Sequence, residues 1–138
     1  MNIGNVSVYV NDLDRAVAFY RDVLGWEVRS DEPIDGKRWV TVAPPGAKTS
    51  FALVKNFADW SPAMVGGWSG IVIDVPDAIR AYADLSSRGV EFAEPPRQEG
   101  DGWWASFADS EGNLFGLHDS RGRGTPAAKG LMTKFIGA

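Results

Sequence analysis

The sequence contains no cysteine and only one histidine. The lack of cysteine excludes disulfides, cysteine-ligated zinc and thiol nucleophiles, and it agrees with a reducing compartment. No apolar run approaches the roughly 20 residues that a membrane-spanning helix needs. The first residues also lack the charged and then apolar pattern of a signal peptide. We therefore expect a cytoplasmic protein with no membrane partner.

Basic residues are too few and too scattered to form a nucleic-acid-binding surface. The chain carries 14 Lys and Arg against 18 Asp and Glu, which gives a net charge of −4. No run of basic residues interleaved with aromatic ones offers a surface for phosphates, so we expect no nucleic-acid partner. At 138 residues, with 44% hydrophobic and 23% charged residues, the chain has the size and composition of one globular domain.

The two halves of the chain repeat one pattern. Residues 8–28 read as strand, helix and strand, and residues 71–92 repeat that order. Each half continues with a strand, a turn and a further strand, which predicts an α+β fold of two tandem β-α-β-β-β modules. One module has a single helix behind a curved sheet, so we expect two modules to pair and to form a cup.

The helix of each module has a start signal, an apolar stripe and a glycine at its end. Asp12 is the N-cap candidate of the first helix and Gly25 its stop. The second helix is expected to carry Pro76 in its first turn and to end at Gly89. The stripes predicted to be buried are Leu13, Ala16, Val17, Tyr20 and Leu24 in the first helix and Ile79, Tyr82 and Leu85 in the second.

We expect one domain over residues 1–138. Its first module covers about 1–56 and its second 69–119, with a linker at 57–68 and a tail at 120–138. The linker contains Gly, Pro and Ser, but also two Trp and one Met, which is more apolar area than an exposed linker normally carries. We therefore expect it to pack across part of the protein, whereas docking and fraying are both open for the tail.

Three motifs resemble those of the vicinal oxygen chelate superfamily. They are VSVYVNDL at residues 6–13, the Phe19–Tyr20 pair before Gly25, and DSEGNLF at residues 109–115. The superfamily contains glyoxalase I, extradiol dioxygenases, fosfomycin-resistance enzymes and bleomycin-resistance proteins. The resemblance covers about residues 3–119. It implies a curved, cup-shaped mixed sheet with the helices outside, a ligand cavity in the cup, and often a homodimer.

The resemblance also implies where a metal would be held. Metal-dependent members carry His, Gln or Glu at one point on the first and last strands of each module, and the ion chelates two neighbouring substrate oxygens. In this chain those points fall on Asn5, Ala52, Gly70 and Gly116. One neutral amide cannot offset the cost of dehydrating a divalent cation. We therefore expect no metal and no other cofactor.

Strand alternation identifies the residues that share a face with these points. Glycine and alanine at the coordination points are expected to leave space for an organic, aromatic ligand, with Trp residues as walls. Only one of Trp103 and Trp104 can point inward, because neighbouring residues of a strand face opposite sides. The predicted ligand-binding residues are Asn5, Ser7, Tyr9, Trp39, Ala52, Gly70, Asp74, Trp104, Gly116 and His118.

Structural roles are open for several of these residues. The Trp side chains could fill the core or an interface, and Asp74 could cap the helix that follows it. His118 lies at the end of a strand, where we expect it to be half exposed. Surface or capping roles are expected for Asp12, Arg15 and Arg38.

The preferred functional hypothesis is a metal-independent binding protein of the glyoxalase and bleomycin-resistance type, which would sequester a small aromatic molecule as antibiotic-resistance proteins do. The acidic balance favours a cationic guest. The alternative is a divergent lyase, isomerase or dioxygenase-like enzyme of the same superfamily that uses Tyr9, Asp74 and His118 as acid–base groups. In a third hypothesis the linker fills the cup, and the protein acts through its dimer surface or a partner.

Overall fold

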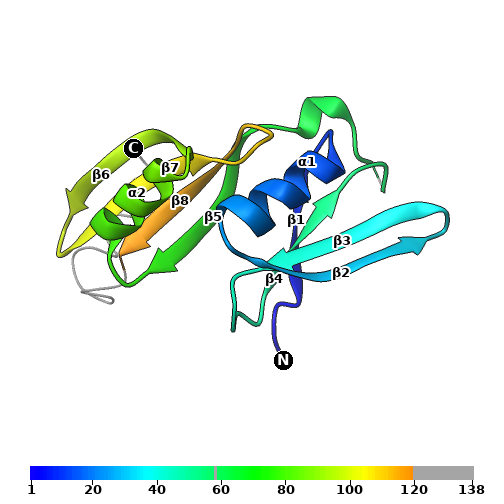
Figure 1. Ribbon diagram of the computed structural model, residues 1–138, viewed down its shortest axis with the longest axis horizontal. Coiled ribbons are helices and arrows are strands. Elements are labelled where there is room, and N and C mark those ends of the chain that lie inside the picture. The colour runs from blue at the N-terminus through cyan, green and yellow to red at the C-terminus, as the bar shows by residue number, and fades with distance from the viewer. Residues whose placement is uncertain (58, 120–138) are drawn as a thin grey trace. The chain divides into compact units, whose positions relative to one another are not determined.

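The computed structural model describes residues 1–57 and 59–119, so the expected tail lies outside the described residues. The chain divides into two compact units (Figure 1). The first unit consists of Met1–Ser69 and a short return segment, Asp109–Asn113. Of the described residues, the second unit contains Gly70–Ala108 and those from Leu114 to Asp119.

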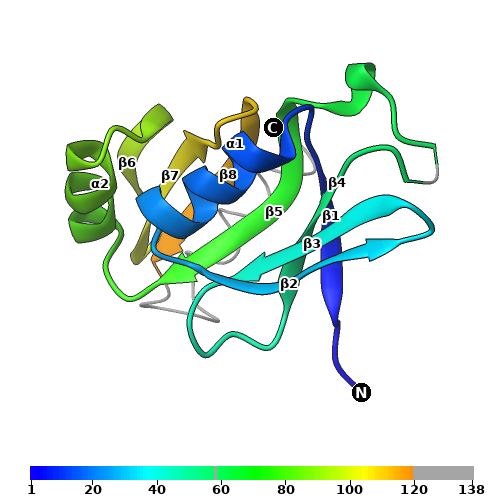
Figure 2. The same ribbon diagram turned by 45° about the vertical axis from the view of Figure 1, so that its right-hand side comes forward.

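The order of helices and strands confirms the two β-α-β-β-β modules of an α+β fold (Figures 1 and 2). The first module contains β1 (Asn5–Tyr9), α1 (Leu13–Ala18) with a π-helical turn at Phe19–Val23, β2 (Glu27–Ile34), β3 (Lys37–Ala43) and β4 (Ser50–Val54). A 3-10 turn at Pro62–Met64 follows. The second module contains β5 (Gly67–Val75), α2 (Ala78–Ser87), β6 (Glu91–Glu99), β7 (Gly102–Ala108) and β8 (Asn113–Asp119).

Each module has a four-stranded sheet, and the two sheets have equivalent strand orders. The orders are β1-β4-β3-β2 and β5-β8-β7-β6. In the first sheet β1 runs parallel to β4, whereas β3 is antiparallel to both of its neighbours. In the second sheet β7 is antiparallel to β6 and to β8. The pairing of the two sheets into a cup stays a prediction.

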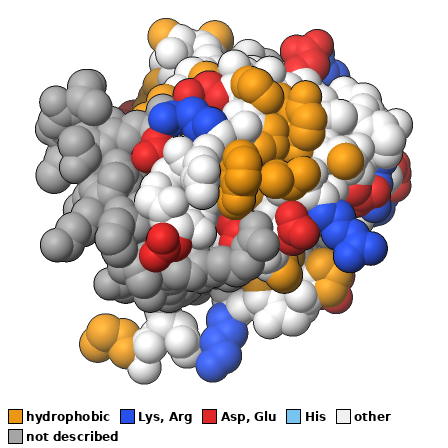
Figure 3. All heavy atoms as spheres, turned by 90° about the vertical axis from the view of Figure 1, so that its left-hand side faces the viewer, with side chains coloured by type: hydrophobic (Ala, Val, Ile, Leu, Met, Phe, Trp, Pro, Cys, Tyr) orange, Lys and Arg blue, Asp and Glu red, His pale blue; other side chains and the backbone are white. Residues whose placement is uncertain are grey.

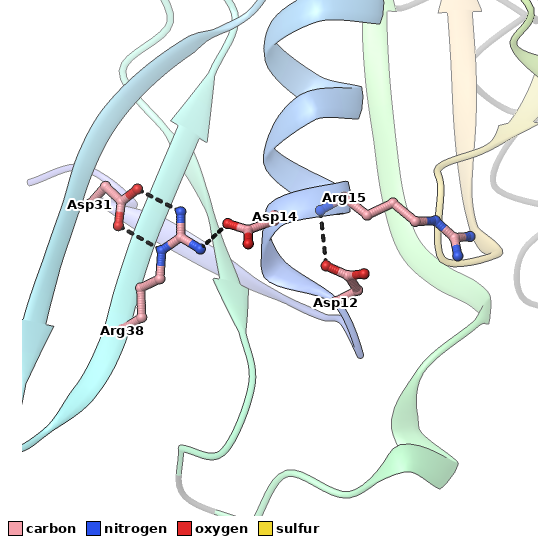
Figure 4. Close-up of polar contacts among 5 residues, drawn as sticks. All are labelled: Asp12, Asp14, Arg15, Asp31 and Arg38. Carbon is pink, nitrogen blue, oxygen red and sulfur yellow. Dashed lines mark hydrogen bonds and ion pairs between the residues drawn. The ribbon is translucent and has the colours of Figure 1, made fainter.

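The first helix begins and ends as its sequence predicts. The side chain of Asp12 accepts a hydrogen bond of 3.0 Å from the backbone N–H of Arg15, which is an N-cap interaction (Figure 4). In the expected apolar stripe Ala16, Val17 and Tyr20 are buried, whereas Leu13 and Leu24 are only half-buried. The ring of Tyr20 meets that of Phe51 on β4 edge to face, at 5.9 Å between centroids. Gly25 has φ 75, a conformation that glycine adopts without steric cost.

The second helix begins at Ala78, after Pro76, which was expected in its first turn. Its N-cap is Asp77, whose side chain accepts from the backbone N–H of Arg80 at 3.0 Å, so Pro76 lies before the cap and not in the first turn. The predicted place of Ile79 in the buried stripe is wrong, since 47% of this residue is exposed. Ala78, one position earlier, is buried in its place. A small residue there lets the helix backbone approach the sheet closely.

Aromatic side chains join α2 to its sheet. The ring of Tyr82 packs against that of Phe92 at 4.7 Å between centroids, and further ring contacts lead from Phe92 to Phe107 and from there to Phe115. This face of the second sheet is therefore the one that the helix covers. On the side where α2 and β6 lie in Figure 1, hydrophobic side chains gather between acidic and basic groups (Figure 3).

The expected surface roles of the charged residues of the first module are confirmed. The guanidinium of Arg38 on β3 bonds both to Asp31 on β2 and to Asp14 on α1 (Figure 4). The hydrogen bond from Arg38 lowers the pKa of the Asp31 carboxyl. Arg15 donates from its side chain to the backbone carbonyl of Ser110. None of the helices in residues 1–57 and 59–119 has the length and hydrophobicity that a membrane span requires.

Candidate ligand-binding site

The predicted site residues of the first module share the face of the sheet that α1 does not cover. Ser7 of β1 pairs with Ala52 of β4, which pairs in turn with Thr41 of β3. Residues that pair directly point to the same side, and Trp39 precedes Thr41 by two positions. We call this side the helix-free face of the first sheet. Its residues are Asn5, Ser7, Tyr9, Trp39, Thr41, Ala52 and Val54.

The second sheet has an equivalent helix-free face. Trp104 of β7 pairs with His118 of β8, and Ser106 pairs with Gly116. Trp104 therefore shares a side with Gly116, and Trp103 points to the other side. This agrees with the expectation that only one of the two faces the site. Asp74 and Glu94 join this face through hydrogen bonds to its residues. The helix-free face of the second sheet consists of Asp74, Glu94, Trp104, Ser106, Gly116 and His118.

The expectation that Gly116 leaves space for a ligand is wrong. A Cβ atom added to Gly116 would lie 2.2 Å from Cη2 of the Trp104 ring, which occupies the place of the missing side chain. Trp104 is only 1% exposed, and its indole N–H donates to Oε1 of Glu94 at 3.2 Å. At Gly70, by contrast, an added Cβ would meet no atom within 4 Å, although φ 77 favours glycine there. Ala52 is fully buried.

His118 is buried and paired with a carboxylate. The prediction of half exposure is wrong, since 5% of the residue is exposed. Its Nδ1 lies 2.9 Å from Oδ1 of Asp74, so Asp74 binds the imidazole and does not cap α2, whose N-cap is Asp77. Nε2 of His118 has no hydrogen-bond partner among the described residues. Two of the three predicted acid–base residues thus meet, while Tyr9 belongs to the other unit.

The residues at the superfamily's coordination points do not fit a divalent cation. Asn5 offers one amide, Ala52 a methyl group, and the space at Gly116 is filled by an indole ring. A divalent ion requires several oxygen, nitrogen or sulfur donors. Within residues 1–57 and 59–119, no three His, Cys, Asp or Glu side chains are grouped as a metal site would need.

A pocket of about 340 Å³ opens in the first unit. Two predicted residues, Ser7 and Tyr9, belong to its wall. The remaining lining residues are Val8, Met64, Gly66, Gly67, Trp68, Ser69 and Asn113. The exposed fractions of Met64 and Trp68 are 37% and 45%, so these linker side chains line the pocket without closing it. The apolar content of the linker was the one sequence signal for them.

Hydrogen bonds of the segment Asp109–Asn113 fix one side of this pocket. The carboxylate of Asp109 accepts hydrogen bonds from the Tyr20 hydroxyl at 2.7 Å and from the backbone N–H groups of Glu111 and Asn113. The side chain of Asn113 donates to Asp109 and to the carbonyl of Tyr9, and it accepts from the backbone N–H of Gly66. The motif that carried part of the family resemblance is therefore a buried hydrogen-bond network.

This network predicts how stability responds to alkaline pH. Burial, together with the neighbouring Asp109 carboxylate, raises the pKa of Tyr20 well above its ordinary value of about 10. The unfolded chain then loses the phenolic proton at lower pH than the folded protein, so Tyr20 contributes its full stability below pH 10 and progressively less above it. Denaturant unfolding between pH 8 and pH 11 should show a fall above pH 10 that is shallower in Tyr20→Phe. Equal slopes in both proteins would contradict this assignment.

The sequence and the fold have relatives among known proteins. The model of the Glyoxalase/Bleomycin resistance protein/Dioxygenase superfamily matches residues 2–117. The uncharacterised protein YetH of Bacillus subtilis is 32% identical over 122 residues, which covers 85% of this chain and 97% of YetH.

Two solved structures are also similar. UcmS2 is 30% identical with a TM-score of 0.76, and the match covers 87% of this chain and 98% of UcmS2. TnmS3, an antibiotic binding protein from Streptomyces sp. CB03234, is 34% identical with a TM-score of 0.71, and the match covers 85% of this chain and 93% of TnmS3. The chain belongs to the Glyoxalase/Bleomycin resistance protein/Dioxygenase superfamily.

Proposed function

We propose that this protein binds a small organic molecule with an aromatic ring and does so without a metal ion. The observation that carries the proposal is the pocket of the first unit, in which Tyr9 and Trp68 supply aromatic surface. The similarity to TnmS3 supports it, since an antibiotic binding protein 34% identical to this chain shares its fold. The pocket and this similarity favour ligand binding over catalysis for this member of the superfamily.

The composition of the pocket suits a flat, mostly apolar guest. Its volume of about 340 Å³ falls within the range of small-molecule sites, which are typically lined by apolar side chains with a few polar anchors. Aromatic walls favour ring stacking, and the unbranched thioether of Met64 adapts to irregular shapes. The hydroxyl groups of Ser7 and Ser69 supply the polar anchors.

The proposed independence from metal is supported by the donor set at the superfamily's coordination points. Isothermal titration calorimetry with a panel of planar aromatic compounds, such as naphthalene, 2-naphthol and acridine, is expected to find a binder. Its dissociation constant should be the same before and after dialysis against EDTA. A tenfold loss of affinity that added zinc or magnesium restores would overturn this part of the proposal.

The contribution of Trp68 gives a direct test of the pocket. Trp68→Ala is expected to weaken binding of the best panel compound about tenfold or more, because a truncated aromatic anchor loses both ring contact and buried area. Ile79→Ala is a matched control, since Ile79 is similarly exposed but lies on α2. Equal affinities for the two variants would locate the ligand elsewhere and defeat the proposed site.

We also propose that the protein forms a homodimer. Native mass spectrometry of the same samples tests this.

A further inference from the structure

A groove of about 490 Å³ lies along one flank of α2, at the start of the helix in the second unit. Positions 77, 80, 81 and 84 line it, which is the spacing of one helical face. Tyr82, which packs on Phe92, belongs instead to the face that meets the sheet. The lining residues of the groove are Val75, Pro76, Asp77, Arg80, Ala81 and Asp84.

The groove combines apolar surface with carboxylates. Val75 and Ala81 are only half-buried, so part of their apolar surface still faces solvent. Asp77 and Asp84 add two carboxylates against the one guanidinium of Arg80, and the side chain of Asp84 is 55% exposed. A segment that carries both apolar and basic side chains would complement this surface.

The described part of the chain ends beside this groove. Asp119 is its last residue and is fully buried, and its Oδ2 accepts a hydrogen bond of 3.3 Å from the backbone N–H of Ala78 in the first turn of α2. β8, which ends at Asp119, is the neighbour in the sheet of β5, which ends at Val75. The residues that follow Asp119 therefore begin within reach of the groove.

The sequence of residues 120–138 has the complementary composition. All 18 Asp and Glu residues of the chain precede it, so the segment is basic and the rest of the chain is acidic. Its basic residues are Arg121, Arg123, Lys129 and Lys134. Its larger apolar residues are spaced as on one side of a helix, and they are Leu131, Met132, Phe135 and Ile136.

We infer that residues 131–136 dock in the groove on α2 of their own chain. The apolar side chains of the segment cover Val75 and Ala81, and its lysines lie toward the carboxylates of the groove. Tethering to β8 gives the segment an effective concentration of about a millimolar, which favours it over the same segment of a second copy. This inference goes beyond the proposed function, since it concerns the flank of α2 and not the pocket of the first unit.

The lack of cysteine makes a single spin label specific. In ¹⁵N-labelled full-length Thr133→Cys that carries a nitroxide, the amide signals of Ala81 and Asp84 should lose the most intensity. Adding Phe135→Ser and Ile136→Ser to the labelled protein should restore these signals. The strongest loss on the helix-free face of the second sheet, at Glu94 and Ser106, would overturn the inference, and so would a loss that the two serines leave unchanged.

A mixed sample distinguishes docking within one chain from docking between two. Spin-labelled protein without ¹⁵N is mixed with ¹⁵N-labelled protein that carries no spin label. The signals of Ala81 and Asp84 should then keep their intensity. A loss as large as in the doubly labelled chain would make a second copy the occupant and would overturn docking within the chain.

A variant of the groove tests the same contact without a label. Ala81→Arg fills the groove and adds positive charge, so trypsin should cut after Lys134 about tenfold faster than in the unaltered protein, because cleavage follows the open fraction of the segment. Ala83→Arg is a matched control, since Ala83 is exposed on the same helix and does not line the groove, and it should leave the rate unchanged.

Asp84→Lys keeps the test decisive if Ala81→Arg disturbs folding, which circular dichroism would detect. This exposed substitution reverses one charge of the groove and should speed the same cut about threefold, in line with the modest strength of surface ion pairs. Equal cleavage rates in Asp84→Lys, Ala83→Arg and the unaltered protein would overturn the inference.

Discussion

Replacing Gly116 with alanine is expected to destabilise the protein by about 3 kcal/mol, the upper part of the usual range for overpacking a core. The added methyl carbon would lie 2.2 Å from Cη2 of Trp104 and 2.6 Å from Cζ3 of the same ring. The indole cannot move aside easily, because it is buried and its N–H is bonded to Glu94. Guanidinium unfolding, followed by circular dichroism, measures the loss.

Two comparisons isolate the contact between the methyl group and the indole. Gly4→Ala is a matched control, since an alanine Cβ there would meet no atom within 4 Å. Trp104→Ala alone should cost about 3–5 kcal/mol through the cavity that it leaves. In that background Gly116→Ala should cost less than about 1 kcal/mol, because the clash is gone. A single Gly116→Ala variant as stable as Gly4→Ala would show that the indole does not occupy this place.

Replacing Asp109 with alanine is expected to cost about 4 kcal/mol, because several hydrogen bonds are lost at once and each unsatisfied buried group costs roughly 1–3 kcal/mol. The hydroxyl of Tyr20 and the backbone N–H of Asn113 would both remain buried without this acceptor. Thermal and denaturant unfolding measure the change. Because Asn113 also lines the pocket of the first unit, the affinity for a pocket ligand should fall in parallel.

Controls for this variant distinguish the network from general effects of charge. Asp101→Ala removes the same charge from an exposed position in the turn between β6 and β7 and should change stability by less than about 0.5 kcal/mol. Asp109→Asn keeps one acceptor oxygen and should fall between the two. A loss below about 1 kcal/mol in Asp109→Ala would mean that the network contributes little.

Much of the fold could be predicted because it depends on local patterns. The repeat of strand and helix periodicities gave the two modules, and Asp12 and Gly25 delimit the first helix as predicted. The start of the second helix was misplaced because Pro76 and Asp77 are both ordinary residues for a helix start. The structure distinguishes them, because the side chain of Asp77 accepts a hydrogen bond from an N–H group of the first turn.

The candidate site was predictable where it depends on strand alternation alone. Period two placed Ser7, Tyr9 and Ala52 on one face, and pairing in the sheet bears this out. The filling of the space at Gly116 was not predictable, because it depends on a ring that reaches across from a neighbouring strand. The contact of His118 with Asp74 was likewise not predictable, because it joins residues of β8 and β5 that are far apart in the sequence.

The return segment Asp109–Asn113 limits how the chain can be divided into fragments. It lies between β7 and β8 of the second module, yet its contacts group it with the first unit. A free polypeptide ending near Ser69 would lack the acceptors for Tyr20 and for the backbone of Asn11. The first module alone would therefore lack part of its own hydrogen-bond network.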